Sequence, residues 1–478
     1  MALRRWAGQP RLGETSLTHR RATKWTLPRT TIPALVLLLL LLPGSQSVAA
    51  LHGSARNIPP GHPLATAQDS LPPGQWEKAR PGDVTPLGLT DEQKQEIARL
   101  RSIGYLSGTQ SVPARVGVTV YDSEKAHDGY NFYTSGHLQG AILADMEGNI
   151  VHEWRCDFAE VWPDYVRREH GRGDKPGEWF PWTSSASWRR AYLYENGDVL
   201  GVYEGVGVVK LDRDSRVLWS YLGGCHHDLD VLDDGTVYVL TRDAHILPRY
   251  HKHWPVLEDY VSVLDAGGRE MQRVSVLEAF ERSGYTSFLE GMKRRGDFLH
   301  TNTVEVLDGR LADRNPAFRK GNVLISVRKL DVIAVIDMER AEVVWALGGL
   351  WDAQHQPTVL ENGRMLIFDN RGERTPKDEE ASKVFEFDPF TQEIHWSYGG
   401  GRIDFYSRTC GSAERLPNGN TLITESDFGR AFEVTEGGEI VWEFMNPARA
   451  GNRDEFIATL FEVVRVPRGY VAGWLRAK

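Results

Sequence analysis

The sequence predicts an all-β fold, a six-bladed β-propeller whose ring is closed by pairing strands from the two ends of the chain. Three observations predict it: tight hairpin turns recur between Asn196 and Asn418, a tryptophan ends most of the repeats, and the two ends carry complementary half-repeats. Repeats of roughly 40 to 55 residues are typical of propellers and solenoids. We therefore assign residues 116–478 to a propeller domain.

Five glycine-containing turns lie between alternating apolar residues. Asn-Gly and Asp-Gly favour the tight turns of antiparallel hairpins because both residues tolerate positive φ. The turns are at Asn196-Gly197, Asp234-Gly235, Gly321-Asn322, Asn362-Gly363 and Asn418-Gly419. This pattern favours antiparallel hairpins over βαβ units.

The second half of each repeat is a further hairpin whose last strand ends in tryptophan. The first copy runs from Ala144 to Trp154, and later copies end at Trp219, Trp345, Trp396 and Trp442. The wide gap between Trp219 and Trp345 contains residues 261–276, which supply a repeat without the tryptophan.

The two ends of the domain supply the halves of one more repeat. Residues 461–470 read as a first hairpin without its second half, and residues 141–154 as a second half without its first. Joining them removes exposed strand edges, as propellers do. An open β-sandwich array is the alternative, but it would not need complementary half-repeats.

The amino-terminal segment, residues 1–50, differs in composition from the rest. Basic residues precede an apolar run at 32–42, which is shorter than the roughly 20 residues needed to cross a bilayer. Small residues at Ser47-Val48-Ala49 suit cleavage of a signal peptide. We expect export, to the periplasm or by secretion, and the alternative of an uncleaved anchor formed by residues 32–42 stays open.

Residues 51–115 read as a mostly irregular linker, because they are rich in Pro, Gly, Ser and Ala. Within the linker, Thr90-Asp91-Glu92-Gln93 matches a capping box and predicts one short helix ending near Ser102.

The composition is that of an ordinary globular protein, with 41% hydrophobic and 25% charged residues and a net charge of -9. The domain has no long basic run, which excludes nucleic acid as a partner. Cys156, Cys225 and Cys410 are too few for a disulfide framework or a CxxC zinc site. One bridge or three thiols both stay open.

The first strand of each propeller blade lines the central channel, so residues at the heads of different repeats meet there. Three heads carry histidine, in Cys225-His226-His227-Asp228, Leu299-His300-Thr301-Asn302 and Gln354-His355-Gln356. Strand alternation favours His227, His300 and His355 as the channel-facing residues, although the choice between His226 and His227 stays open. Arg328, predicted on the second strand of its repeat, is a fourth candidate.

Imidazoles grouped with an arginine suit the transfer of an anionic group. Neutral imidazole is a nucleophile near pH 7, and arginine stabilises negative charge on the oxygens of a transferring group. The fixed charge of Arg328 would oppose a metal ion, so we expect neither a metal nor a cofactor at this site.

Together these residues resemble the bacterial arylsulfate sulfotransferase family. The resemblance extends over most of residues 116–474 and is most specific at the three histidine heads, at Ser326-Val327-Arg328 and at residues 368–374. It implies a six-bladed propeller that transfers a sulfuryl group from a phenolic sulfate to a phenol, without a nucleotide sulfate, through a sulfohistidine. By motif His355 is the nucleophile, with His227, His300 and Arg328 around the sulfuryl group.

The chain departs from that family in two ways. It has no close cysteine pair, and a linker stands where family members carry an amino-terminal β-domain. Substrate range and a homo-oligomeric state therefore stay open. The alternative function is a non-catalytic propeller that binds an anionic ligand or a protein partner.

Several aromatic residues are candidates for a ring-binding mouth above the site. They are Phe180, Trp182, Trp188, Tyr192, Phe405 and Tyr406.

Overall fold

The computed structural model describes residues 89–101, 106–163, 187–372, 381–401, 405–451 and 453–475. All of them belong to one of the two compact units into which the chain divides. The predicted signal or anchor segment and most of the predicted linker lie outside the described residues. None of the described helices has the length and apolarity to cross a bilayer.

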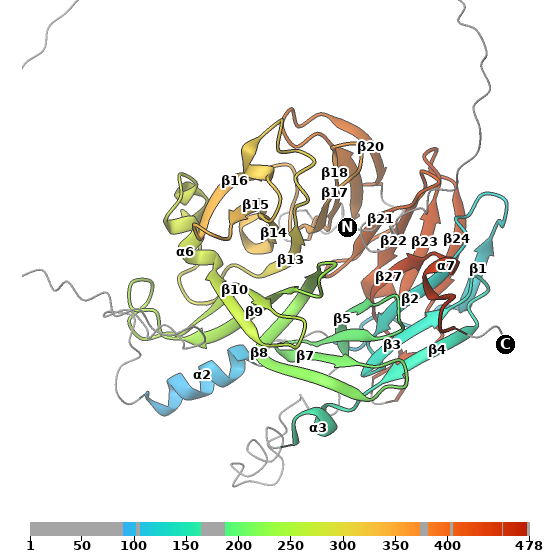
Figure 1. The fold of residues 1–478 in the computed structure, drawn as a ribbon, viewed down its shortest axis with the longest axis horizontal. Coiled ribbons are helices and arrows are strands. Elements are labelled where there is room, and N and C mark those ends of the chain that lie inside the picture. Colours follow the sequence, from blue (N-terminus) through green and yellow to red (C-terminus); the bar gives the residue numbers. More distant parts are fainter. Residues whose placement is uncertain are drawn as a thin grey trace, which may run out of the picture. The chain divides into compact units, whose positions relative to one another are not determined.

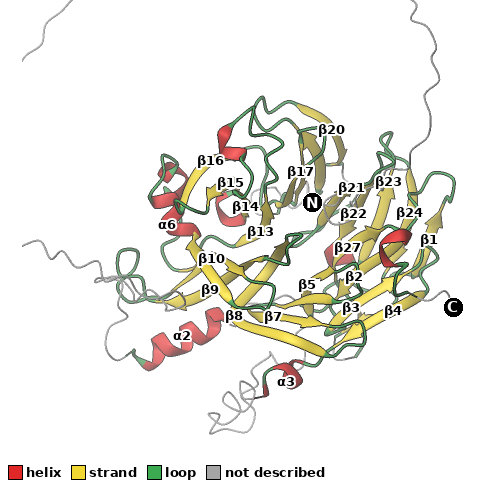
Figure 2. Ribbon diagram, viewed as in Figure 1, coloured by secondary structure: helices red, strands yellow, loops and turns green. Residues whose placement is uncertain are grey.

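The described part is built almost wholly from antiparallel β-sheets set around a common centre (Figures 1 and 2). Three sheets have four strands each. The first contains β13 (Thr301–Val306), β14 (Val323–Val327), β15 (Val332–Asp337) and β16 (Glu342–Gly348). The second contains β17 (His355–Val359), β18 (Met365–Asp369), β19 (Lys383–Phe387) and β20 (Ile394–Gly399). The third has the order β27 (Leu460–Val466), β2 (Tyr130–Ser135), β3 (Gly140–Ala144) and β4 (Ile150–Arg155).

Two further sheets are larger. A five-stranded sheet has the order β1 (Gly117–Tyr121), β24 (Ile440–Met445), β23 (Arg430–Val434), β22 (Thr421–Glu425) and β21 (Ser412–Arg415). The largest runs through β11 (Glu270–Ser275), β10 (Val256–Leu264), β9 (Val237–His245), β8 (Val217–Val231), β7 (Val206–Leu211), β6 (Val199–Tyr203) and β5 (Trp188–Leu193), with β12 (Gly296–Asp297) parallel to β10. A short pair is formed by β25 (Arg449–Ala450) and β26 (Phe456–Ile457). The prediction of an all-β, propeller-like fold is confirmed.

Helices are few and short in the described residues. The α-helices are α2 (Asp91–Arg101), α3 (Phe158–Val161), α6 (Val276–Glu281) and α7 (Arg468–Val471). The 3₁₀ turns are η1 (Thr286–Leu289), η2 (Pro316–Phe318), η3 (Arg328–Leu330) and η5 (Ser426–Phe428). Helix α2 opens on a reciprocal capping box, in which Thr90 N donates to Gln93 Oε1 and Gln93 N donates to Thr90 Oγ1.

The recurring tryptophans tie neighbouring sheets together. The indole N–H of Trp154 donates to Gly197 O at 3.0 Å, and that of Trp442 donates to Met146 O at 2.9 Å. Both acceptors lie in a hairpin turn of the next sheet, so each ring is buried between two sheets and its polar atom is satisfied.

Carboxylates join the inner strands of neighbouring sheets. Asp228 Oδ2 on β8 accepts from Val304 N on β13, Glu305 Oε2 on β13 accepts from Val359 N on β17, and Glu414 Oε2 on β21 accepts from Arg465 N on β27. These amide groups lie on strand edges that pair with no further strand. The side chains therefore satisfy buried donors that would otherwise be costly.

Strands from the two ends of the domain share one sheet. Strand β2 pairs antiparallel with β27, from Tyr130 opposite Val466 to Ser135 opposite Leu460. Cys156, Cys225 and Cys410 are all buried, free thiols.

Candidate active site

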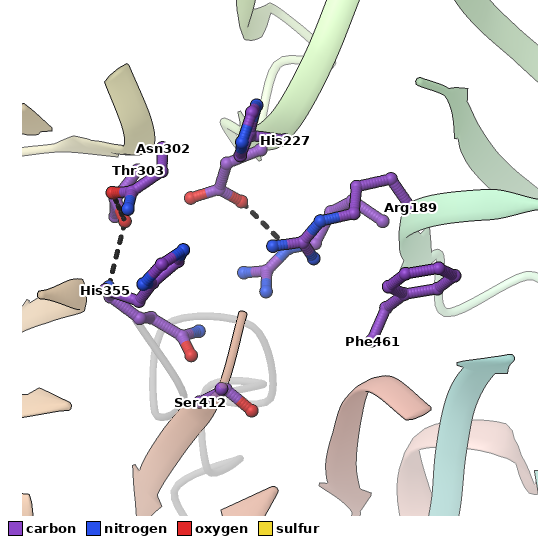
Figure 3. A pocket seen from close by; sticks show the side chains of 11 residues that line it. Arg189, His227, Asn302, Thr303, His355, Ser412 and Phe461 are labelled. Atoms are coloured by element: carbon purple, nitrogen blue, oxygen red, sulfur yellow. Dashed lines mark hydrogen bonds and ion pairs between the residues drawn. The ribbon is translucent and has the colours of Figure 1, made fainter. Parts of the chain in front are cut away.

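A small cavity is lined by residues from six strands, which belong to the five larger sheets (Figure 3). The lining residues are Arg189 and Arg190 on β5, His227 and Asp228 on β8, Asn302 and Thr303 on β13, His355 and Gln356 on β17, Gly411 and Ser412 at β21, and Phe461 on β27. Residues far apart in the sequence therefore meet at one point, as expected for repeat heads.

The backbone is bulged at or beside three of these strands. His227 and His300 both have φ of 54° and Gln356 has φ of 45°, values in the left-handed region that non-glycine residues seldom adopt. Strand register shifts in the same places, between Cys225 and Leu229 and between His355 and Thr358. Such bulges re-aim side chains and are over-represented beside active sites.

His355 is held by one nitrogen and leaves the other without a partner. Its Nδ1 lies 2.7 Å from Asn370 Oδ1 and 3.2 Å from Ala353 O. Asn370 Nδ2 donates to Ser407 O and Cys410 O, so the amide is oriented with its oxygen toward the imidazole. Both neighbours of Nδ1 are acceptors, which places the proton on Nδ1 and a lone pair on Nε2.

The Nε2 atom of His355 is buried and has no hydrogen-bond partner within the described part of the chain. Burial first, and then the positive charges of Arg328 and Arg189, hold the pKa of His355 well below the ordinary value for histidine. The imidazole is therefore neutral near pH 7, and its Nε2 atom carries a lone pair. His355 is one of the residues that line the cavity.

The other two predicted histidines are in contact with each other. His227 Nε2 lies 3.2 Å from His300 Nε2, and His300 Nδ1 is hydrogen-bonded to Asp297. His227 is among the residues that line the cavity, and His300 is not. His226 turns away from the cavity: its Nδ1 is 2.6 Å from His227 Nδ1 and its Nε2 is 3.7 Å from Asp259 Oδ1.

Arg328 differs from the prediction in its secondary structure. It follows β14 and begins the 3₁₀ turn η3, so the assignment to the second strand is wrong. Its main-chain N donates to His300 O at 3.2 Å, which fixes the turn beside that histidine. The bulge at His300 displaces both residues from regular strand positions, and for the same reason His300 precedes β13 rather than lying within it.

Arg189 is a site residue that the sequence reasoning missed. It is buried in the cavity wall, and its guanidinium carbon lies 5.5 Å from the centre of the Phe461 ring. Its neighbour Arg190 forms ion pairs with Asp228 and Glu462. Its position at the head of a repeat could have predicted this role. The prediction considered only the heads that carry histidine.

The predicted aromatic mouth is wrong for two of its members. Trp188 and Phe405 are packed into hydrophobic core clusters instead, because each fills the space between neighbouring sheets. Phe180 and Trp182 lie outside the described residues. Phe461 is the aromatic side chain that lines the cavity.

Glu204, His226 and His227 bring three potential ligand atoms within 4.8 Å of one another. Both oxygens of Glu204 already face donors: Arg242 Nη1 lies 3.3 Å from Oε1, and the main-chain N of His227 donates to Oε2 at 2.9 Å. The 2.6 Å separation of the two Nδ1 atoms fits a shared proton. We therefore assign no metal to this cluster.

Residues 192–447, more than half of the chain, match the family model described as Arylsulfotransferase (ASST). The chain belongs to the arylsulfotransferase family. The family implies, at a general level, a sulfotransferase that uses an aryl sulfate donor and a phenol acceptor. The predicted family is thereby confirmed. No curated protein sequence matches the chain.

Solved structures with a similar course of the chain are remote in sequence. A protein of unknown function from Bacteroides caccae is 13% identical over 70% of this chain and 98% of its own, with a TM-score of 0.42. The C-terminal WD40 domain of Sif2 is 8% identical over 76% of this chain and 100% of its own, with a TM-score of 0.39. Virginiamycin B lyase from Staphylococcus aureus is 10% identical over 54% of this chain and 69% of its own, with a TM-score of 0.31. The family assignment therefore rests on the family model.

Proposed function

We propose that this arylsulfotransferase moves a sulfuryl group from a phenolic sulfate ester to an acceptor phenol through a sulfohistidine at His355, without a nucleotide sulfate. The observation that carries the proposal is the buried, unpartnered Nε2 of His355 on a residue that lines the cavity. A buried lone pair without a donor costs stability, and a nucleophile is a physical reason to retain it.

In the first half-reaction, the Nε2 lone pair of His355 forms a bond to sulfur while the bond from sulfur to the phenolic oxygen breaks. The electron pair of that bond leaves with the phenolate. In the second half-reaction, the oxygen of an acceptor phenol attacks the same sulfur, and the electron pair of the N–S bond returns to Nε2. The enzyme ends as it began, so no cofactor is needed.

Cationic groups beside His355 would stabilise the three outer oxygens as charge gathers on them. We assign this role to Arg328 and Arg189, whose charges both lower the pKa of His355. His227 and His300 complete the site and handle the proton of the leaving or attacking phenol.

The test is mass spectrometry of the purified protein after exposure to p-nitrophenyl sulfate without acceptor. We expect a sulfuryl adduct on a peptide containing His355, which disappears when phenol is added. His355→Gln should abolish the adduct and lower turnover by at least about 1000-fold, since a lost nucleophile has no substitute. His245→Gln is the matched control, because His245 pairs with Glu258 on β9 and β10 away from the cavity.

Two other outcomes would indicate a different function. Release of p-nitrophenol at the same rate with and without acceptor would indicate a hydrolase. No release from a panel of aryl sulfates would favour the alternative, a propeller that only binds an anionic ligand or a protein partner.

We further propose that the strands form six blades in a closed ring. Strand β8 spans 15 residues and pairs with β7 along its first part and with β9 along its last part, as expected if one strand ends one blade and begins the next. The pairing of β2 with β27 would then provide the closure.

We also propose export of the protein, with residues 1–50 as signal peptide or anchor, residues 51–115 as linker and residues 116–478 as the catalytic domain. The support is the short apolar run at 32–42 and the small residues that follow it. Fractionation of cells that produce the full chain, with sequencing of the mature amino terminus, tests this.

A further inference from the structure

His227 needs a source for the proton that it gives to the leaving phenol. Burial first, and then the neighbouring cationic groups, hold the pKa values of His226 and His227 well below the ordinary histidine value, so both imidazoles are neutral near pH 7. A neutral imidazole can pass a proton on, but it cannot store an extra one. A group that stores the proton must lie beyond these two imidazoles.

Four side chains form a continuous series that starts at the cavity. His300 Nε2 faces His227 Nε2 at 3.2 Å, His227 Nδ1 faces His226 Nδ1 at 2.6 Å, and His226 Nε2 faces Asp259 Oδ1 at 3.7 Å. We call His227, His226 and Asp259 the relay. The longest step is the one to Asp259, and such contacts in free enzymes often tighten when substrate binds.

The relay uses the proton arrangement in which His300 is neutral. Asp297 accepts from His300 Nδ1–H, and the lone pair at His300 Nε2 accepts from His227 Nε2–H. His227 Nδ1 then accepts from His226 Nδ1–H. His226 Nε2 keeps a lone pair, is buried and has no hydrogen-bond partner in the described residues. It is ready to accept a proton from Asp259.

We propose that His226 and Asp259 are a proton relay and store for both half-reactions. The proposal rests on the function proposed above. As the phenolate leaves, its oxygen takes the proton of His227 Nε2. His226 passes its Nδ1 proton to His227 Nδ1, and Asp259 passes its carboxyl proton to His226 Nε2. Asp259 is left as a carboxylate and both imidazoles are neutral.

The second half-reaction reverses the series. The acceptor phenol gives its proton to His227 Nε2 as its oxygen attacks sulfur. His227 returns a proton from Nδ1 to His226, and His226 returns one from Nε2 to Asp259. No proton is gained or lost over the cycle, so the relay needs no connection to solvent.

The surroundings of Asp259 suit a store. Burial, together with the negative charge of Asp297, raises the pKa of Asp259 to about 7, so the carboxyl group can hold or release a proton at neutral pH. Its second oxygen accepts from Thr301 N at 2.7 Å, which leaves Oδ1 for His226.

The charged groups around the relay come from four different elements. Glu204 follows β6, Arg242 lies on β9, Asp297 on β12 and Arg189 on β5. Glu204 and Arg242 form an ion pair at 3.3 Å. Asp297 is already engaged by its hydrogen bond with His300 Nδ1, so it is not the store.

The experiment compares donors whose leaving phenols differ in acidity. Acidic p-nitrophenol departs without a proton, whereas p-cresol needs one. We expect Asp259→Asn to slow single-turnover sulfation of His355 by p-cresyl sulfate by at least about 100-fold, and by p-nitrophenyl sulfate less than about threefold. His226→Gln should show the same contrast, and the double variant should be no slower than either single variant, because both interrupt one relay.

Glu258→Gln is the matched control, because Glu258 is the buried carboxylate next to Asp259 on β10 and faces His245 instead of His226. We expect it to leave the contrast between the two donors at its wild-type value.

The results separate this proposal from the function on which it rests. If the wild-type protein sulfates His355 but both variants slow the two donors equally, or slow neither, the relay is wrong and the function stands. If the wild-type protein forms no adduct with either donor, the proposed function fails.

Discussion

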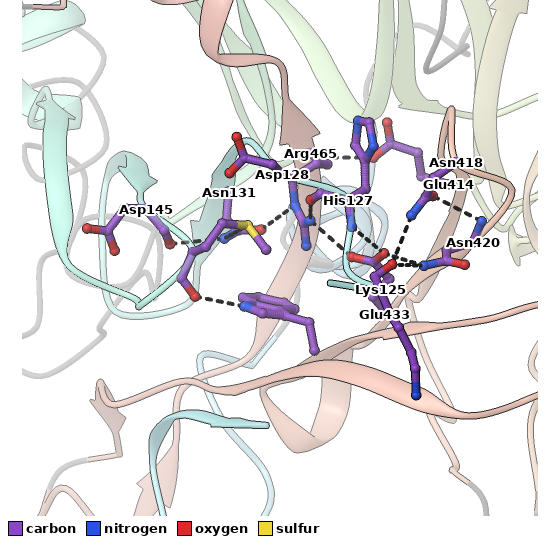
Figure 4. A network of polar contacts seen from close by, with 12 residues as sticks. Lys125, His127, Asp128, Asn131, Asp145, Glu414, Asn418, Asn420, Glu433 and Arg465 are labelled. Atoms are coloured by element: carbon purple, nitrogen blue, oxygen red, sulfur yellow. Dashed lines mark hydrogen bonds and ion pairs between the residues drawn. The ribbon is translucent and has the colours of Figure 1, made fainter. Parts of the chain in front are cut away.

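The cavity around His355 and the ion-pair network around Arg465 are both buried and both join strands from several sheets, but they differ in how they treat charge. Arg465 is fully buried, with Nη1 3.0 Å from Glu433 Oε2 and Nε donating to Asn131 Oδ1 at 3.0 Å (Figure 4). Its Nη1 also donates to the main-chain oxygen of His127. The network is made of opposite charges in contact.

The cavity instead gathers neutral imidazoles. Within the described residues, His355 Nε2 and Arg465 Nη2 are both buried without a hydrogen-bond partner. Arg465 Nη2 belongs to a guanidinium that can only donate and already contacts a carboxylate, whereas His355 Nε2 carries a lone pair on a residue that lines the cavity. Substitutions in the two regions should therefore have separable effects on stability and on rate.

The largest expected effect is a loss of stability when Arg465 is substituted. Arg465→Met leaves the carboxylate of Glu433 buried and unpaired, which should lower the free energy of unfolding by about 3–5 kcal/mol. Urea unfolding measures this, and the sulfation rate per folded molecule should stay within about twofold of wild type. The double variant Arg465→Met with Glu433→Gln should recover much of the loss. Equal stability of single variant and wild type would contradict a structural role for the pair.

A smaller effect, on rate, is expected at Asn370. Asn370→Leu removes the acceptor that fixes the proton of His355 on Nδ1, and we expect the single-turnover sulfation rate to fall about 10- to 100-fold with donor affinity unchanged. Asn322→Leu is the control, since Asn322 is equally buried and donates to Ala317 O in a loop away from the cavity. Both variants should lose similar stability. If both also lost activity to the same extent, Asn370 would have no role in positioning His355.

The smallest effect is a pH dependence that differs between donors. The acid form of Asp259 is required when the leaving phenol needs a proton, and its pKa is about 7. The rate with p-cresyl sulfate should therefore fall as pH rises through about 7, by up to about tenfold per pH unit. The rate with p-nitrophenyl sulfate should stay level there.

Neither donor should show a loss of rate near pH 6.5 on the acidic side, because the pKa of His355 lies well below that value. Stopped-flow measurement of p-nitrophenol release and rapid quenching of the cresyl reaction across the pH range test both statements. Identical profiles for the two donors would argue against Asp259 as the store.

Much of the fold could be predicted from the sequence because the turns and tryptophans that indicate it are local features of the chain. Gly197 and Gly419 adopt φ near 90° in the turns where their Asn-Gly dipeptides predicted hairpins. Trp154 and Trp442 recur because each reaches a turn of the next sheet, a contact that repeats with the chain. The half-repeats at the two ends correctly predicted that the ends of the domain share one sheet, but the division between them is wrong. Residues 461–470 contain one strand, β27, and the start of helix α7, and the strand paired with β27 is β2.

The site could be predicted only in part, because bulges interrupt the strand alternation from which the orientation of its residues was predicted. Strand alternation assigned His300 and Arg328 to strands, whereas His300 precedes β13 at a positive φ and Arg328 begins a 3₁₀ turn. Asn370 owes its orientation to the carbonyl groups of Ser407 and Cys410, residues far along the chain whose approach no local pattern encodes.

The carboxylates that bridge neighbouring sheets recur at one position of the repeat. Glu305 and Glu414 each lie two residues before the leucine that opens the hairpin turn, and each accepts from a main-chain N–H of the next inner strand. A slip of one residue would turn the carboxylate to the other face of its sheet and break this bond. The bridges therefore hold neighbouring inner strands at a fixed height relative to one another, as a shared cavity at their centre requires.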